Sequence, residues 1–125
     1  MKATELAIAA LTRSYGFLEK ALDGLNVEHL YYMPTPTANS IAWLVWHLSR
    51  WKDNNTARLS NIQSLWESQG WASRFNMPNN SAGMGDTSED VAAFRPSREL
   101  LFAYAIAAQS AALERISLIA PADLK

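Results

Sequence analysis

The side chains in this sequence that are most able to do chemistry lie in one stretch, NSIAWLVWHLSRWKD, at positions 39–53. This stretch places one histidine, His47, among three tryptophans and several aliphatic residues. A neutral imidazole exchanges protons near pH 7 and is also a common ligand of zinc and nickel. A lone histidine beside apolar residues is, however, more often a hydrogen-bonded core residue. His47 therefore has three open roles: packing residue, acid or base, and one ligand of a metal site.

A metal site needs at least three protein ligands, and the sequence offers His47 few partners. The chain has no cysteine, and its only other histidine is His29, which lies in a predicted turn before two prolines. Asp53 follows His47 by six residues, which places it about 120° around a helix and makes it a poor second ligand from the same helix. The spacing therefore gives His47 no matching ligand within its own segment.

Three further groups of residues have both a structural and a functional interpretation. Arg50 and Asp53 are three residues apart and are predicted to form a surface pair worth about a few tenths of a kcal/mol. A structural salt bridge to the long connection or to the third helix is the alternative. The segment Gly83–Thr87 suits a turn and a helix cap better than a phosphate site, because it lacks the lysine of a phosphate-binding loop. Core packing is the preferred role of the five tryptophans, and lining an apolar ligand pocket is the alternative. The tryptophans are Trp43, Trp46, Trp51, Trp66 and Trp71.

Apolar residues three and four apart predict three long helices and an all-α fold. The first helix is expected over about Thr4–Leu25. The second is expected to begin after an N-cap at Asn39 or Ser40 and to reach about Glu67. The third is expected over about Ser97–Ile119, where many alanines favour close approach to a neighbour. The predicted core stripe of the second helix comprises Ile41, Leu44, Leu48, Trp51, Asn55, Leu59 and Ile62.

A long connection is predicted over Ser68–Asp86, where glycines and asparagines accumulate. A connection of this length usually covers a site or crosses a bundle. Thr87 and Asp90 resemble a capping box and predict one short helix over Ser88–Phe94. The residues expected to pin the connection to the body are Trp71, Phe75 and Met77.

Composition limits the classes of protein that the chain can belong to. Its 125 residues fit a single domain, residues 1–125, and half of them are apolar. Acidic and basic residues nearly cancel, with a net charge of −1 and scattered lysines and arginines, so no nucleic-acid partner is expected. No segment is apolar enough for a membrane span or a secretory signal, and we expect no membrane association and a cytoplasmic location.

The sequence resembles the DinB-like superfamily, which includes mycothiol-dependent enzymes and many actinobacterial proteins. The resemblance lies in Asn39–Arg50 followed by Asp53, in Gly83–Arg95, and in Pro121–Leu124. It implies a four-helix bundle of up-down-down-up type. It also implies a divalent metal held by three histidines, one from the second bundle helix and two from the fourth, and His47 matches the ligand on the second helix.

This sequence departs from the family pattern in ways that bear on the metal. It stops where the fourth bundle helix is expected, so that helix is missing or supplied by a partner chain, and the domain is expected to be shortened at its C-terminus. Asn55 and Asp86 stand where relatives often have histidine. A zinc or nickel ion is therefore expected only if another chain, through an unrelated histidine or a neighbouring subunit's His29, completes the site around His47.

Two functions follow from the sequence. The preferred one is a non-catalytic or degenerate member of the superfamily that dimerises through the face left open by the missing helix, because a large uncovered apolar surface promotes association. Such a module has a cavity for a small apolar or thiol ligand, or binds none. The alternative is a metal-dependent thiol transferase or hydrolase of the mycothiol type, with His47 as one metal ligand.

Overall fold

The computed structural model describes residues 3–119, and within this range every regular element is a helix. The all-α prediction is confirmed, and so are the three long helices. The short helices number four in the described chain, not one. No helix among residues 3–119 is both long and apolar enough to cross a membrane. In chain order the helices are α1 (Ala3–Leu22), α2 (Val27–Tyr31), α3 (Ile41–Leu59), α4 (Leu65–Ser68), α5 (Trp71–Arg74), α6 (Ser88–Ala93) and α7 (Arg98–Ser117).

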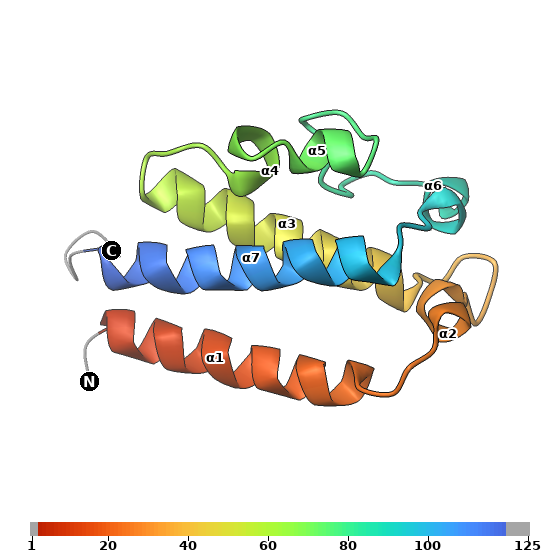
Figure 1. Cartoon of the computed structure of the whole chain (residues 1–125), viewed down its shortest axis with the longest axis horizontal. Helices are drawn as coiled ribbons and strands as arrows, with labels where there is room; N and C mark the ends of the chain where they lie inside the picture. Colours follow the sequence, from red (N-terminus) through yellow and green to blue (C-terminus); the bar gives the residue numbers. More distant parts are fainter. Residues whose placement is uncertain (1–2, 120–125) are drawn as a thin grey trace.

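The three long helices form an up-down-down arrangement (Figure 1). Helix α1 runs in one direction, and α3 and α7 both run back. Helix α7 packs against α3 and also against α1. The parallel course of α3 and α7 requires the chain to return along the bundle between them, and residues 60–97 make this crossing with α4, α5 and α6.

All three long helices end earlier than the sequence pattern predicts, and α7 ends at Ser117 instead of about Ile119. Helix α1 stops at Leu22, and Gly24 soon after it adopts a left-handed conformation with φ of 81°. Helix α3 stops at Leu59 instead of about Glu67, because the chain turns at Asn61 with φ of 56°. The separate helix α4 follows this turn. The short helix α2 was not predicted, although Asn26 caps it by accepting a hydrogen bond from the backbone N–H of His29.

The predicted helix starts are confirmed by their caps. The Ser40 hydroxyl accepts a hydrogen bond from the backbone N–H of Trp43 at the start of α3. Thr87 and Asp90 form the expected reciprocal capping box of α6, each side chain accepting from the backbone N–H of the other. Helix α6 ends at Ala93, one residue before the predicted end. The boundary predicted at Pro121 lies outside the described residues.

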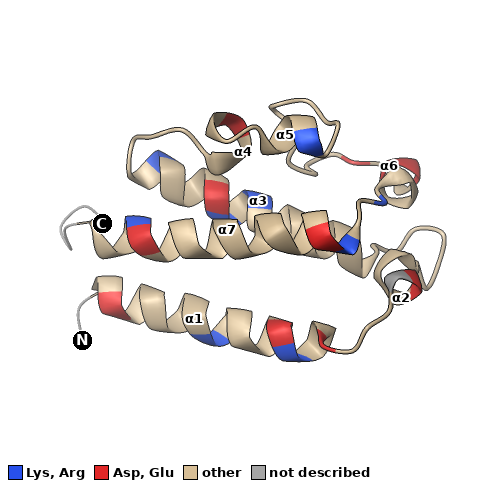
Figure 2. Cartoon of the chain, viewed as in Figure 1, with Lys and Arg blue, Asp and Glu red and all other residues tan. Residues whose placement is uncertain are grey.

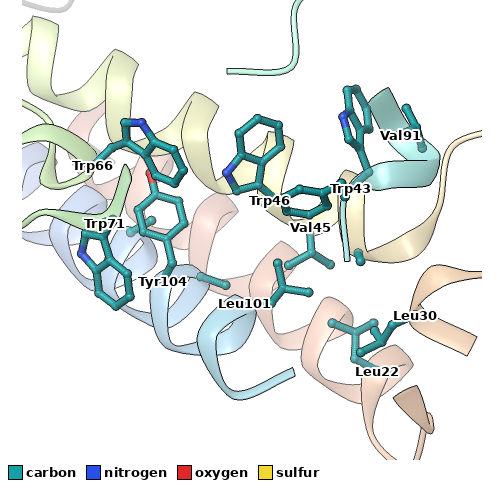
Figure 3. Close-up of a cluster of buried hydrophobic side chains, with 14 of the residues drawn as sticks. Leu22, Leu30, Trp43, Val45, Trp46, Trp66, Trp71, Val91, Leu101 and Tyr104 are labelled. Carbon is teal, nitrogen blue, oxygen red and sulfur yellow. The ribbon is translucent and has the colours of Figure 1, made fainter. Parts of the chain in front are cut away.

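The core is an aromatic cluster between α3, α7 and the long connection (Figure 3). Trp46 of α3, Trp66 of α4 and Tyr104 of α7 are all fully buried. The ring centroid of Trp66 lies 5.3 Å from that of Tyr104 and 5.9 Å from that of Trp46. Tilted and edge-to-face contacts between aromatic rings at such distances stabilise the fold in addition to the burial of their apolar surface. The crossing connection is therefore pinned to the two parallel helices. The sequence predicted this role for three residues, and all three pack in or against the cluster: Trp71, Phe75 and Met77.

Candidate functional site

The imidazole of His47 is half-buried on α3 and faces the connection instead of the bundle interior. Its Nδ1 atom lies 2.5 Å from the carbonyl oxygen of Ala82, and its ring stacks on that of Trp43 with centroids 4.6 Å apart. A carbonyl oxygen only accepts hydrogen bonds, so Nδ1 carries the proton. In the neutral ring Nε2 is then the nitrogen with the free lone pair.

Three side chains on one side of α3 hold the loop at residues 81–86. Arg50 donates from Nε to the carbonyl oxygen of Ser81 at 2.8 Å. His47 donates from Nδ1 to Ala82, and Trp43 donates from Nε1 to the Asp86 carboxylate at 2.9 Å. The donors are spaced four and three residues apart, which places them on the same side of the helix. The loop is therefore fixed to α3 along about two helical turns.

The close approach of this loop depends on Gly83. Its φ of 92° is in the left-handed region that favours glycine, and a Cβ there would lie 2.5 Å from Nδ1 of His47 and 2.9 Å from Cζ2 of Trp43. Both neighbours are atoms of two rings that stack on each other, and neither is the end of a flexible side chain. Glycine at this position is what allows the loop to lie directly on the His47 ring.

The described residues do not by themselves fit a metal ion. Within residues 3–119 no cluster of three or more histidine, aspartate or glutamate side chains could hold one. His29 is exposed on α2, and Asp86 accepts a hydrogen bond from Trp43. His47 therefore presents one imidazole nitrogen, while a metal site requires at least three protein ligands.

Asp53 is buried, and the predicted surface pair with Arg50 is wrong. The carboxylate of Asp53 is 0% exposed and forms a salt bridge of 3.0 Å with Arg115 of α7. Arg50 is also buried, and its guanidinium lies over the Trp66 ring. The alternative interpretation of this pair, a salt bridge to another segment, is correct for Asp53. The pairing with Arg115 has no local sequence signal, because the two residues are far apart in the chain.

The Asp53 carboxylate also organises the start of α4. It accepts hydrogen bonds from the backbone N–H groups of Leu65 and Trp66, at 2.8 and 2.9 Å, and from the Tyr104 hydroxyl at 2.7 Å. Burial, together with the negative charge of Asp53, raises the pKa of Tyr104 well above its usual range. Tyr104 therefore stays protonated and donates. This network is structural: the carboxylate accepts from two backbone N–H groups, the Tyr104 hydroxyl and the Arg115 guanidinium, and it has no contact with solvent.

Two surface hollows of about 600 Å³ lie away from the tryptophans. One lies between α5, α6 and the start of α7, with Arg74, Arg95, Asp86 and Asp90 in its lining. The other lies between α1 and α7 and is lined largely by apolar residues such as Leu18, Leu22 and Phe102. No tryptophan lines either hollow. Four of the five tryptophans are buried, as the packing interpretation predicted, and Trp51 is the exception.

Apart from Ile41, which packs against the core, the apolar stripe predicted as the core face of the second helix lies on the outside of α3. That prediction is wrong, because α3 is apolar on two opposite sides and a spacing of three and four residues describes both. The buried side includes Ala42, Val45, Trp46 and Ala57. We call the exposed side the outward seam; its large apolar members are between 40% and 60% exposed. The outward seam comprises Leu44, Leu48, Trp51, Asn55, Leu59 and, just after the helix, Ile62.

Acidic and basic residues are interspersed along the helices in the view of Figure 2. On α3, Arg50 and Asp53 are buried and Lys52 is half-buried. Lys52 donates to the side-chain oxygen of Gln109 on α7, and burial lowers its pKa. Arg58 is the one exposed charged side chain of α3 and borders the outward seam.

The fold and this surface define an all-helical bundle protein with an open apolar side. A family model described as the DinB superfamily matches residues 10–125, and the chain belongs to this superfamily. The predicted resemblance is confirmed.

A solved structure supports the same fold. A conserved protein from Enterococcus faecalis superposes with a TM-score of 0.85 and is 28% identical to this chain. The match covers 96% of this chain and 72% of the other. No curated protein matches the chain.

Proposed function

We propose that the chain is a non-catalytic member of the DinB superfamily that acts as an interaction module and forms a homodimer through the outward seam. The observation that carries the proposal is the row of large apolar side chains along α3, each at least 40% exposed within the described chain. A helix that is apolar on two opposite sides is typical of one packed on both. The proposal includes a cytoplasmic location, in agreement with a sequence that contains no cysteine.

The seam is suited to association because it is continuous and nearly free of charge. Leu44, Leu48 and Trp51 follow one another at spacings of four and three residues, as in the apolar seam of a coiled coil. Single exposed apolar residues are common on protein surfaces, but contiguous apolar patches mark interaction sites. Burying the exposed half of a leucine side chain contributes about 1 kcal/mol to the free energy of association. In a two-fold interface each seam residue makes this contribution twice, once from each copy.

The test is the mass of the protein in solution, compared between two matched variants. Leu48→Lys places a charge in the seam, and Ile106→Lys places the same charge on α7, where Ile106 is 55% exposed and Leu48 is 48% exposed. Sedimentation analysis is expected to give a dimer for the unmodified chain and for Ile106→Lys. Leu48→Lys is expected to weaken the dimer about a hundredfold or more, because two unpaired charges are buried. A monomeric unmodified chain contradicts the proposal, and so does a dimer that Leu48→Lys leaves intact.

A second candidate is a metal-dependent thiol transferase or hydrolase with His47 as one ligand. The bond from Nδ1 of His47 to Ala82 favours it, because histidine ligands usually donate their other ring nitrogen to such an acceptor. The donor set of the described residues opposes it, since further ligands would have to come from outside this set. Elemental analysis of the purified chain and of His47→Ala separates the two candidates: near one zinc or nickel per chain, lost in the variant, supports the enzyme.

A further inference from the structure

We infer that the partner on the outward seam is a second copy lying antiparallel, with the two-fold axis near residue 53 and Trp51 of each copy against the partner's Asn55. This inference rests on the proposed function, which it deepens by fixing how the two α3 helices pair. The observations behind it are the spacing of the seam residues, their unused hydrogen-bonding atoms and the position of the exposed charge.

The middle of the seam is symmetric about residue 53. Trp51 and Asn55 both lie within α3, at equal distances along the helix from this residue. An antiparallel partner therefore places Asn55 opposite each Trp51. The central layer then pairs the largest side chain, Trp51, with a small one. A parallel partner instead places two Trp51 indoles in one layer, and overpacked layers of this kind are destabilising.

The polar atoms of the central layer also favour an antiparallel pair. Asn55 donates from its amide nitrogen to the backbone oxygen of Trp51 at 2.8 Å. Within residues 3–119, no hydrogen bond is made by the indole N–H of Trp51 or accepted by the side-chain oxygen of Asn55. The indole only donates, and the amide oxygen only accepts. In the antiparallel dimer, the indole N–H of each Trp51 lies next to the side-chain oxygen of the partner's Asn55. The contact occurs once on each side of the two-fold axis, so both polar groups form a hydrogen bond when they are buried.

Arg58, the exposed charge beside the seam, also favours an antiparallel pair. In a parallel pair the two Arg58 side chains lie in the same layer and repel each other. In the antiparallel pair Arg58 lies against the partner's Leu48, where its aliphatic stem packs. The two guanidinium groups are then about 15 Å apart at a helical rise of 1.5 Å per residue, beyond the screening length of about 8 Å at physiological salt.

The experiment uses introduced cysteines, which report cleanly because the chain contains none. Leu48→Cys and Arg58→Cys are made singly, one with a short tag, and are oxidised alone and as a mixture. A disulfide requires Cβ atoms about 4 Å apart. The antiparallel pair predicts a disulfide between the two variants in the mixture and none in either variant alone. Ile106→Cys, outside the seam, measures the background from collisions, and circular dichroism checks that each variant is folded.

The outcomes separate the inference from the function on which it rests. A cross-linked product in the mixture, at least tenfold above that of each variant alone and above the Ile106→Cys background, supports the antiparallel pair. A dimeric unmodified chain whose single variants each cross-link to themselves overturns the pairing but leaves the dimer through the seam intact. A dimer without any cross-link above background overturns the pairing and the seam as its interface. A monomeric unmodified chain overturns the proposed function, and the inference with it.

Discussion

Replacing Asp53 by asparagine is expected to cost this protein a large part of its stability. The carboxylate is 0% exposed and accepts from four groups: two backbone N–H groups of α4, the Tyr104 hydroxyl and the Arg115 guanidinium. All four partners donate, so the amide nitrogen of asparagine has to face donors. Arg115, which is 6% exposed, loses the one carboxylate it pairs with in the described chain.

The magnitude follows from the unpaired charge. Removing one partner of a buried ion pair costs about 3–5 kcal/mol. A domain of this size is stable by about 5–15 kcal/mol, so Asp53→Asn is expected to shift the urea midpoint strongly and to lower the free energy of unfolding by about 3–5 kcal/mol. The matched control is Asp23→Asn, which removes the same charge from an exposed position after α1 and is expected to change stability by less than about 0.5 kcal/mol.

The assay is urea unfolding followed by circular dichroism and by tryptophan fluorescence, with amide hydrogen exchange at Leu65 and Trp66. These two amides are expected to lose protection before the rest of the chain, because the carboxylate that anchors them is gone. The double variant Asp53→Asn with Arg115→Gln is expected to be less destabilised than the sum of the single variants. If Asp53→Asn lowers the free energy of unfolding by less than about 1 kcal/mol, and the slope of this free energy against urea concentration is unchanged, the buried ion pair does not have the stabilising role inferred from the structure.

Two further predictions concern the loop beside His47 and the buried tyrosine. Gly83→Ala is expected to destabilise the fold by about 1–3 kcal/mol and to shift the His47 ring resonances in NMR spectra. The control is Gly85→Ala, which has a similar φ of 80° but no atom within 4 Å of its Cβ, so that it adds only backbone strain. Equal effects of the two substitutions contradict the close approach of the loop to His47. Above pH 10 an unfolded Tyr104 ionises while the buried one stays protonated, so the unfolded chain binds fewer protons and stability falls as pH rises. Tyr104→Phe is expected to flatten this alkaline loss in unfolding titrations, and an unchanged pH dependence counts against the raised pKa.

The sequence predicted the local structure well where local interactions decide it. The caps at Ser40 and Thr87 and the three long helices depend on neighbouring residues, and all of them are confirmed. The family resemblance is also confirmed. The helix ends were less predictable, since apolar spacing continues past Leu59 into the turn at Asn61. The partner of Asp53 could not be predicted, because Arg115 reaches it only after α3 and α7 have packed.

The sequence by itself determined an all-α chain, its helix starts and the position of His47 on the second long helix. Only the tertiary structure decided which side of α3 is buried. Both sides carry apolar residues at helical spacing, and the choice depends on where the tryptophans of the distant connection and the alanines of α7 find space to pack. That choice buried Asp53 and Arg50, turned His47 toward the carbonyl of Ala82 and left Leu48 and Trp51 on the surface.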